Sequence, residues 1–222
     1  MIRPGADGPA RWREGPPVVR VSRSMASEPL DEDRRMRIGE WATTNGFELL
    51  DDLDQEAERL PLFVIQTTID RDVHNVCVGL WDDTDVACFD LRRGSGGDRI
   101  DSTGATIAYP YGLPGLLILH PRVADDDRML SSRPVIEDHP LASTYEVRSD
   151  NAAFAVALLE GALATWLMTG RDRFPPMSFE LGSDWLLGYA PQLTVELFPE
   201  LLDGVLGFRD RLSPEVVAAF GR

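Results

Sequence analysis

The chain is 222 residues long, 43% of them hydrophobic, and it has a formal net charge of −15. This length and composition allow one sizeable hydrophobic core, so folding requires neither a metal ion nor a disulfide. The excess of carboxylates argues against nucleic acid as a partner and against a polybasic membrane contact, because both need clustered Lys or Arg. All 22 basic residues are arginine, a chain-wide bias that is typical of GC-rich codon usage rather than of a site.

The first segment is rich in Pro, Gly and Arg and has no apolar periodicity. Residues 1–24 hold five arginines against two acidic residues, a local charge of 5 − 2 = +3. This composition predicts a disordered tail over residues 1–30, followed by one domain over 31–222. Two alternatives are that residues 1–24 precede a true start at Met25 and that they form a short basic arm with a binding role. The segment has no apolar run of the kind a secretory signal needs, so we expect a cytoplasmic protein with reduced thiols.

A helix is predicted near 33–45. Acidic residues crowd its first turn, where the helix dipole favours negative charge, and Ile38, Trp41 and Ala42 form a short apolar stripe. Asn45-Gly46 is a typical helix stop. The acidic segment 51–59 then reads as a linker, and the β-branched residues 62–68 as a strand.

Residues 73–92 predict a β-hairpin around Asp82-Asp83. If these two residues are the loop, paired positions sum to 165, so Cys77 lies opposite Cys88. With a three-residue loop this pairing is lost. We interpret the two cysteines as reduced packing residues, with a redox switch as the alternative.

The rest of the chain predicts further strands, an apolar helix, an amphipathic helix and a last short helix. Predicted strands cover 100–110, 115–121 and 143–150, and a hairpin covers 177–182 and 185–190. The glycine-rich residues 92–99 lack a phosphate-loop motif and are predicted to be a flexible connection. An apolar helix is expected at 151–168, with Asp150 as a plausible N-cap, and it reads as a buried core helix rather than a membrane span. An amphipathic helix is expected at 195–208, started or kinked by Pro199, and a last short helix begins at Ser213-Pro214-Glu215.

No group of residues has the spacing of a recognised active site. A triad of Ser183 and Asp184 with His120 or His139 is conceivable, but Ser183 lacks the strand–turn–helix elbow of a hydrolase nucleophile. Asp125, Asp127, Asp138 and His139 offer ligands for a hard or borderline cation without the spacing of a calcium loop. We therefore assign no catalytic, cofactor-binding or metal-binding residue and expect no cofactor.

Several motifs in a fixed order resemble a known family. They are WATTNGFEL, YPYGLPGLLILHPR, HPLASTYEVRSDNAAFAVALLEGALATWLM and FELGSDWLLGY, followed by a leucine-rich helix. In this order they resemble a family of uncharacterised actinobacterial proteins over roughly residues 33–209. The family has no established activity, so the resemblance carries over no functional residues. Some of its members resemble anchored proteins with an N-terminal membrane segment, from which this chain departs.

Together these patterns predict a single α+β domain. We expect an antiparallel sheet of seven or eight strands, packed by helices near 33–45, 151–168 and 195–208, with a sheet that closes towards a small barrel as a variant. The function indicated is a non-enzymatic, cytoplasmic binding or interaction protein for a protein or small molecule, without a transmembrane segment. The alternatives are a hydrolase that uses scattered Ser, His and Asp residues, and a membrane-surface or lipid-binding module.

Overall fold

A computed structural model describes residues 32–50, 71–93, 100–121, 139–170, 174–182 and 184–222. The helices, with the 3-10 helices labelled η, are α1 (Glu32–Thr44), η3 (Pro140–Ser143), α4 (Ala152–Leu159), α5 (Ala162–Thr169), η5 (Val195–Leu197), α6 (Phe198–Arg209) and α7 (Pro214–Phe220). The strands are β1 (Glu48–Leu49), β2 (Arg71–Trp81), β3 (Thr84–Arg93), β4 (Ile100–Ala108), β5 (Leu116–Leu119), β6 (Glu146–Ser149), β7 (Ser178–Leu181) and β8 (Trp185–Pro191).

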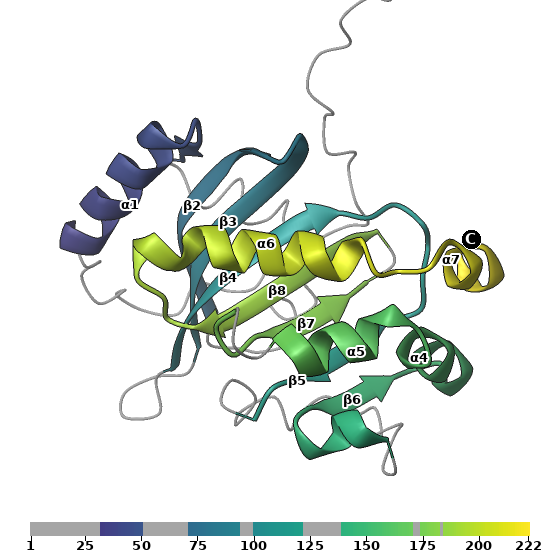
Figure 1. Cartoon of the computed structure of the whole chain (residues 1–222). Helices are drawn as coiled ribbons and strands as arrows, with labels where there is room; N and C mark the ends of the chain where they lie inside the picture. The colour runs from purple at the N-terminus through teal and green to yellow at the C-terminus, as the bar shows by residue number, and fades with distance from the viewer. Residues whose placement is uncertain (1–31, 51–70, 94–99, 122–138, 171–173, 183) are drawn as a thin grey trace, which may run out of the picture.

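The strands form one open sheet in the order β1-β2-β3-β4-β8-β7-β5-β6, and every neighbouring pair is antiparallel. The expected fold class, α+β with an antiparallel sheet, is therefore confirmed, and the barrel variant is not adopted. Helix α6 runs across one face of the sheet, and α1 lies at the end formed by β1 and β2 (Figure 1).

The β2–β3 hairpin has the predicted two-residue loop. Trp81 pairs with Thr84 and Cys77 with Cys88. Asp82 and Asp83 have φ angles of 48° and 58°, the left-handed conformations that a type I′ turn requires and that Asp tolerates better than most residues. The sequence did not indicate the register shift that follows between His74 and Cys77.

The central strands are buried on both faces. On the face under α6, Cys88, Ala105 and Leu186 belong to a large core cluster that includes most of the apolar helix residues. On the opposite face a second cluster contains Val73, Val76, Ala87, Phe89, Leu91, Trp185, Leu187 and Tyr189. Burial of both faces explains why β8 reads as WLLGYAP, an almost continuous apolar run, rather than as a strict alternation.

The helix expected at 151–168 is two helices, so this prediction was wrong. α4 ends at Leu159, α5 begins at Ala162, and their axes are bent by 65°. Gly161 is extended, with φ −90° and ψ −162°, and interrupts the helical backbone. Proline aside, glycine is the residue for which leaving the helical conformation costs the least free energy. The N-cap is Asn151, whose side chain accepts a hydrogen bond from the Phe154 N–H at 3.1 Å, and not Asp150.

The C-terminal helices follow the predicted signals more closely. The segment expected at 195–208 begins as η5 and continues as α6, with Pro199 in its first turn. Ser213 caps α7 by accepting a hydrogen bond from the Val216 N–H at 3.1 Å. Proline at the start of a helix costs no hydrogen bond, since the first N–H groups have no intrahelical partner.

The β7–β8 hairpin agrees with the sequence. Leu181 pairs with Leu186, and the Gly182 N–H donates to the Trp185 carbonyl at 2.9 Å. A Cβ atom on Gly182 would lie 2.4 Å from the Trp185 ring, so glycine is required for the indole to fold back against the turn.

Several sequence predictions lie outside the described residues. These are the tail 1–30 with its possible start at Met25, the linker 51–59, the strand 62–68 and most of the connection 92–99. The two-residue strand β1 was not predicted, because Glu48-Leu49 is too short to show a periodic pattern.

Replacing Trp185 by alanine should lower the free energy of unfolding by about 3–5 kcal/mol, since its side chain is 6% exposed and belongs to the second core cluster. Leu80 is 60% exposed, so Leu80→Ala should change stability by no more than about 0.5 kcal/mol. Urea unfolding followed by circular dichroism measures both. Equal stability of the Trp185 variant and the unmodified chain would show that Trp185 is not part of the core.

Candidate functional site

Helix α1 is fixed to the sheet by a buried arginine. Arg34 is 8% exposed, and its guanidinium donates from Nε and Nη2 to the two carboxylate oxygens of Asp90 on β3, at 2.8 and 2.5 Å. Its Nη1 donates to the Leu193 carbonyl at 2.8 Å. This two-pronged geometry is available to arginine and not to lysine.

Two further side chains complete the polar cluster beneath α1. Asn75 donates from Nδ2 to Asp90 at 2.8 Å, and it has a φ of 52° within the irregular part of β2. The Thr103 hydroxyl accepts from the Leu193 N–H at 3.0 Å and contacts both Arg34 and Asp90. The register shift in β2 thus places the Asn75 amide beside the Asp90 carboxylate, whereas an uninterrupted strand would pair these residues differently.

The cluster fixes which face of α1 points outwards. Arg34, Ile38 and Ala42, four residues apart, are buried, whereas Met36, Glu40 and others on the opposite side are exposed. At its C-terminal end the Phe47 N–H donates to the Ala42 carbonyl at 2.8 Å, and the chain turns directly into β1. The outer face of α1 and the strand β1 therefore form one continuous surface.

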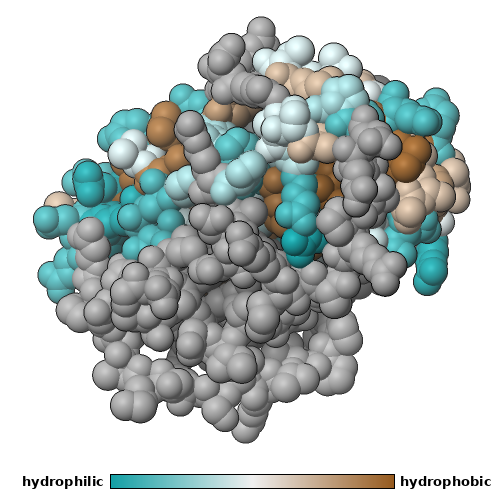
Figure 2. Space-filling view, turned by 90° about the horizontal axis from the view of Figure 1, so that it is seen from below, coloured by the Kyte–Doolittle hydropathy of each residue, from teal (hydrophilic) through white to brown (hydrophobic). Residues whose placement is uncertain are grey.

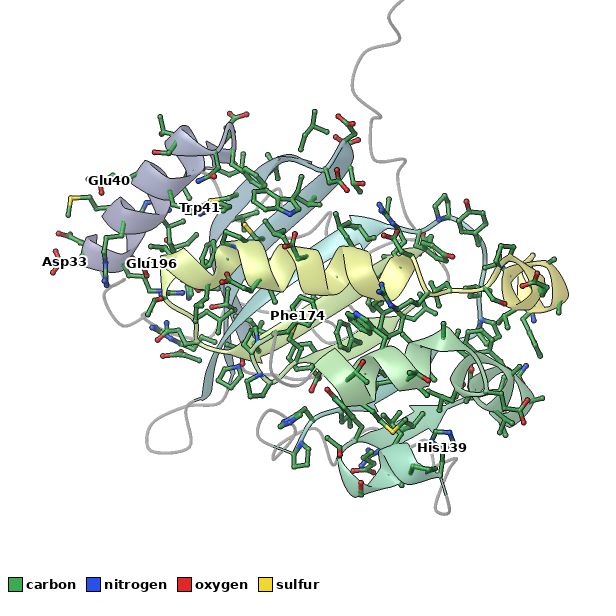
Figure 3. All side chains as sticks on the ribbon, in the orientation of Figure 1. Asp33, Glu40, Trp41, His139, Phe174 and Glu196 are labelled. Carbon is green, nitrogen blue, oxygen red and sulfur yellow. The ribbon has the colours of Figure 1, made fainter. Side chains whose placement is uncertain are left out.

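A groove of about 760 Å³ lies on this surface and is open to solvent. We call it the α1–β1 groove, and the described residues that line it are Met36, Gly39, Glu40, Thr43, Thr44, Phe47, Glu48 and Leu49. Two of these are carboxylates and none is basic. Figure 3 shows Glu40 on the outer side of α1, with Asp33 and Glu196 towards the same end of the molecule.

The short helix η5, which contacts α1, adds the carboxylate of Glu196 near Arg37 of α1. A hydrogen bond from the Thr194 side chain, together with the backbone N–H, lowers the pKa of the exposed Glu196 carboxyl, and Arg37 contributes less. This carboxylate is therefore charged at neutral pH.

The two histidines considered for a hydrolase, His120 and His139, have structural contacts. His139 caps η3, its Nδ1 accepting from the Leu141 N–H at 3.1 Å, and the His120 N–H donates to the Ser178 hydroxyl at 3.0 Å. The His120 ring lies edge-on to Tyr145 at 5.4 Å. Ser183 lies outside the described residues, so the triad with Asp184 remains a prediction that the structure does not test.

The candidate metal ligands are mostly outside the structure described. This holds for Asp125, Asp127 and Asp138, and only His139 of that set is placed. Among the residues that the structure does place, no three His, Cys, Asp or Glu side chains are grouped as metal ligands would be.

Cys77 and Cys88 face each other within the core, as the hairpin register predicted. Both are free thiols with 0% exposure. Hydrogen bonding to the Cys77 thiol and burial raise the pKa of Cys88 well above its ordinary value. A thiol in such a site is a packing residue and a poor nucleophile.

Tyr109 and Tyr111 pack together as turn residues. Their ring centroids are 4.7 Å apart, with Tyr109 buried and Tyr111 half-exposed. Burial, followed by the neighbouring Tyr111, raises the pKa of Tyr109 to about 12, which leaves its hydroxyl protonated at neutral pH.

The sequence did not reveal the Arg34–Asp90 pair or the groove. A signal was present at Arg34, because it shares the i, i+4, i+8 face of Ile38 and Ala42. Its carboxylate partner is 56 residues away in the chain, at a distance where spacing carries no information.

The comparisons with known proteins concern the fold of this chain. No family model matches the sequence, and no curated protein matches it. A solved structure with a similar architecture is the crystal structure of the mycobacterial trehalose monomycolate transport factor A, TtfA, with a TM-score of 0.62 and 20% sequence identity over 79% of this chain and 92% of that one. The chain is thus similar in fold to this transport factor.

The described helices are short or interrupted compared with a membrane span. None of these single helices is long and apolar enough to cross a bilayer, and only the bent pair α4 and α5 reaches the required composition jointly.

Breaking the Arg34–Asp90 pair should destabilise the fold strongly. Asp90→Ala or Arg34→Ala should each lower the free energy of unfolding by about 3–5 kcal/mol, because each leaves a buried charge without its partner. The double variant Arg34→Ala/Asp90→Ala should lose markedly less than the sum of the two single losses. A double-mutant cycle by urea denaturation measures the coupling, and strictly additive losses would contradict it.

Both cysteine thiols should resist modification in the native protein. A thiol reagent such as a dinitrobenzoate disulfide should label neither Cys77 nor Cys88 at neutral pH, and both in denaturant, since both are fully buried. Because the pKa of Cys88 is raised on folding, its contribution to stability is complete below the unfolded pKa of about 8.5. That contribution should decline as pH rises above it, and labelling of the native protein at a rate near that of free cysteine would contradict this assignment.

Proposed function

We propose that this chain is a non-enzymatic, cytoplasmic binding protein that acts as an accessory factor in lipid transport. The observation that carries the proposal is the shared fold with a protein whose described role is that of a transport factor for trehalose monomycolate, across 92% of that factor's chain. The binding activity is directed at a protein or small-molecule partner.

The roles of the polar side chains support binding rather than catalysis. Arg34, Asp90 and Thr103 hold α1 to the sheet, and His139 caps a short helix. Of the residues considered for a hydrolase, His139 thus has a side chain that holds a structural element. A helix that is fixed to a sheet with one face outwards, as α1 is, offers a preformed surface for binding.

A membrane-surface role is a second candidate, favoured by the outer face of α4. Val156 is 40% exposed, and its neighbours Ala152 and Ala153 are exposed as well. In Figure 2 apolar side chains lie at several places among hydrophilic ones on the coloured part of the visible face. The net charge of −15 opposes anionic lipid, so this role requires neutral headgroups.

An affinity purification from the native host tests the proposal. The tagged full chain should retain a defined protein partner from detergent-solubilised membranes or from the soluble fraction, identified by mass spectrometry and absent from tag-only controls. Co-purified lipid, extracted and analysed in the same sample, would connect the complex to lipid transport. A partner with no relation to lipid handling, or the absence of any partner, would contradict the proposal.

Two further measurements separate the alternatives. Turnover of a nitrophenyl ester by the purified chain that disappears in Ser183→Ala would establish the hydrolase instead. Sedimentation with phosphatidylcholine vesicles that is lost in Val156→Glu would establish the membrane-surface role. Failure to sediment with neutral and with anionic vesicles would end that second candidate.

A further inference from the structure

We infer that the α1–β1 groove binds an extended protein segment in which arginine or lysine side chains alternate with long apolar ones. This inference rests on the proposed function as a binding protein and names the surface and the class of partner. Four features of the described residues support it. They are the apolar side chains on the floor of the groove, the edge strand β1, the carboxylates that line the groove and the fixed position of helix α1.

The floor of the groove offers an adaptable apolar contact. Met36 is 59% exposed, the second most exposed of the large hydrophobic residues placed by the structure. Leu49 is half-buried beside it, and the buried Phe47 ring lies beneath, where the absence of a side chain at Gly79 leaves room for it. An exposed, unbranched thioether is the side chain that adapts most readily to varied apolar partners.

One wall of the groove is β1, which lies at the edge of the sheet that the described strands form. β1 pairs with β2 through Glu48↔Val78 and Leu49↔Cys77, and the Leu50 N–H donates to the Val76 carbonyl at 2.9 Å. Because alternate residues of an antiparallel strand point their backbone groups to opposite sides, the N–H and C=O of Leu49 point away from β2. An extended segment that lies along β1 can pair with them, as in recognition by strand addition.

The charge of the groove selects the side chains of that segment. Glu40 and Glu48 are exposed and stand on the helix and strand sides of the groove, and the described residues that line it include no cation. The Thr43 and Thr44 hydroxyls donate to the Gly39 and Glu40 carbonyls, at 2.9 and 2.8 Å. A basic side chain is therefore attracted from both sides, whereas a phosphate or an acidic segment is repelled.

The helix wall is held in place before any partner arrives. Arg34 ties α1 to β3 and to the Leu193 carbonyl on the side opposite the groove. A wall that does not need to be ordered on binding saves conformational entropy, so a short segment can bind with useful affinity.

A pair of synthetic peptides tests the inference on the full chain. The probe is a fluorescein-labelled peptide of roughly ten residues with alternating arginine and leucine, and the comparison peptide alternates glutamate and leucine. Binding is measured by fluorescence anisotropy at about 150 mM salt, where long-range attraction is screened. The arginine peptide should bind saturably, and the glutamate peptide should not bind.

Matched variants separate the groove from general attraction to an acidic protein. Glu40→Arg/Glu48→Arg should weaken binding of the arginine peptide at least about tenfold. Asp150→Arg/Glu160→Arg changes the net charge equally, at exposed residues of the β6–α4 end, the opposite end of the sheet order, and should leave the affinity within about twofold. Met36→Ser should likewise weaken binding, whereas Val156→Ser, an equivalent change on α4, should not. Thermal unfolding confirms that each variant is folded.

Three results would overturn the inference: no saturable binding of the arginine peptide, equal losses in the two charge-reversed variants, or an unchanged affinity after Met36→Ser. The proposed function fails separately. If a lipid-transport partner from the native host is retained equally by the Glu40→Arg/Glu48→Arg variant, the binding role stands and the groove is not its site. If the peptide binds as expected and no native partner is found, the groove stands and the proposed process fails.

Discussion

The buried pair of Arg34 and Asp90 is the constraint on which the arrangement of α1 depends. A charge with so little exposure is tolerated only when its hydrogen bonds are nearly complete, and here the guanidinium is shared between a carboxylate on β3, a hydroxyl on β4 and the Leu193 carbonyl. Apolar contacts alone permit a helix to slide and rotate on a sheet, since they have no direction. The ion pair allows one position, and that position turns Met36 and Glu40 outwards.

The same sheet explains why most of the chain serves structure. Burial of both faces requires apolar residues at consecutive positions, as in β8, and space for rings to interleave. Phe89 and Tyr189 flank Gly104 on adjacent strands of one face, where a Cβ atom would lie 2.8 Å from the Phe89 ring. A sheet packed in this way has little room for a ligand between its layers. A partner then binds at the edges of the sheet and on the outer faces of the helices.

The parts of the fold that could be predicted from the sequence are those set by neighbouring residues. Asp82-Asp83 determined the hairpin register and hence the meeting of Cys77 and Cys88, and Ser213-Pro214 determined the start of α7. The helix at 151–168 was predicted too long because apolar composition was continuous across Glu160-Gly161, while the backbone break depends on how the two halves pack. The candidate site was missed for a related reason. The Arg34–Asp90 pair, which fixes α1, joins residues far apart in the chain. The strand that forms one wall of the groove, Glu48–Leu49, has too few residues to show a periodic hydrophobic pattern.

Strand addition at β1 also follows from how the sheet ends. An edge strand normally invites uncontrolled pairing, and proteins limit this by shortening the edge or placing charge on it. β1 is two residues long and carries Glu48, so it meets both conditions. The same two features make the edge selective: a short strand offers few backbone hydrogen bonds, so binding depends on side chains, and the carboxylate rejects acidic segments. The short, charged strand β1 repels another copy of this acidic chain and so limits self-association. The same strand favours a partner segment that is basic and apolar.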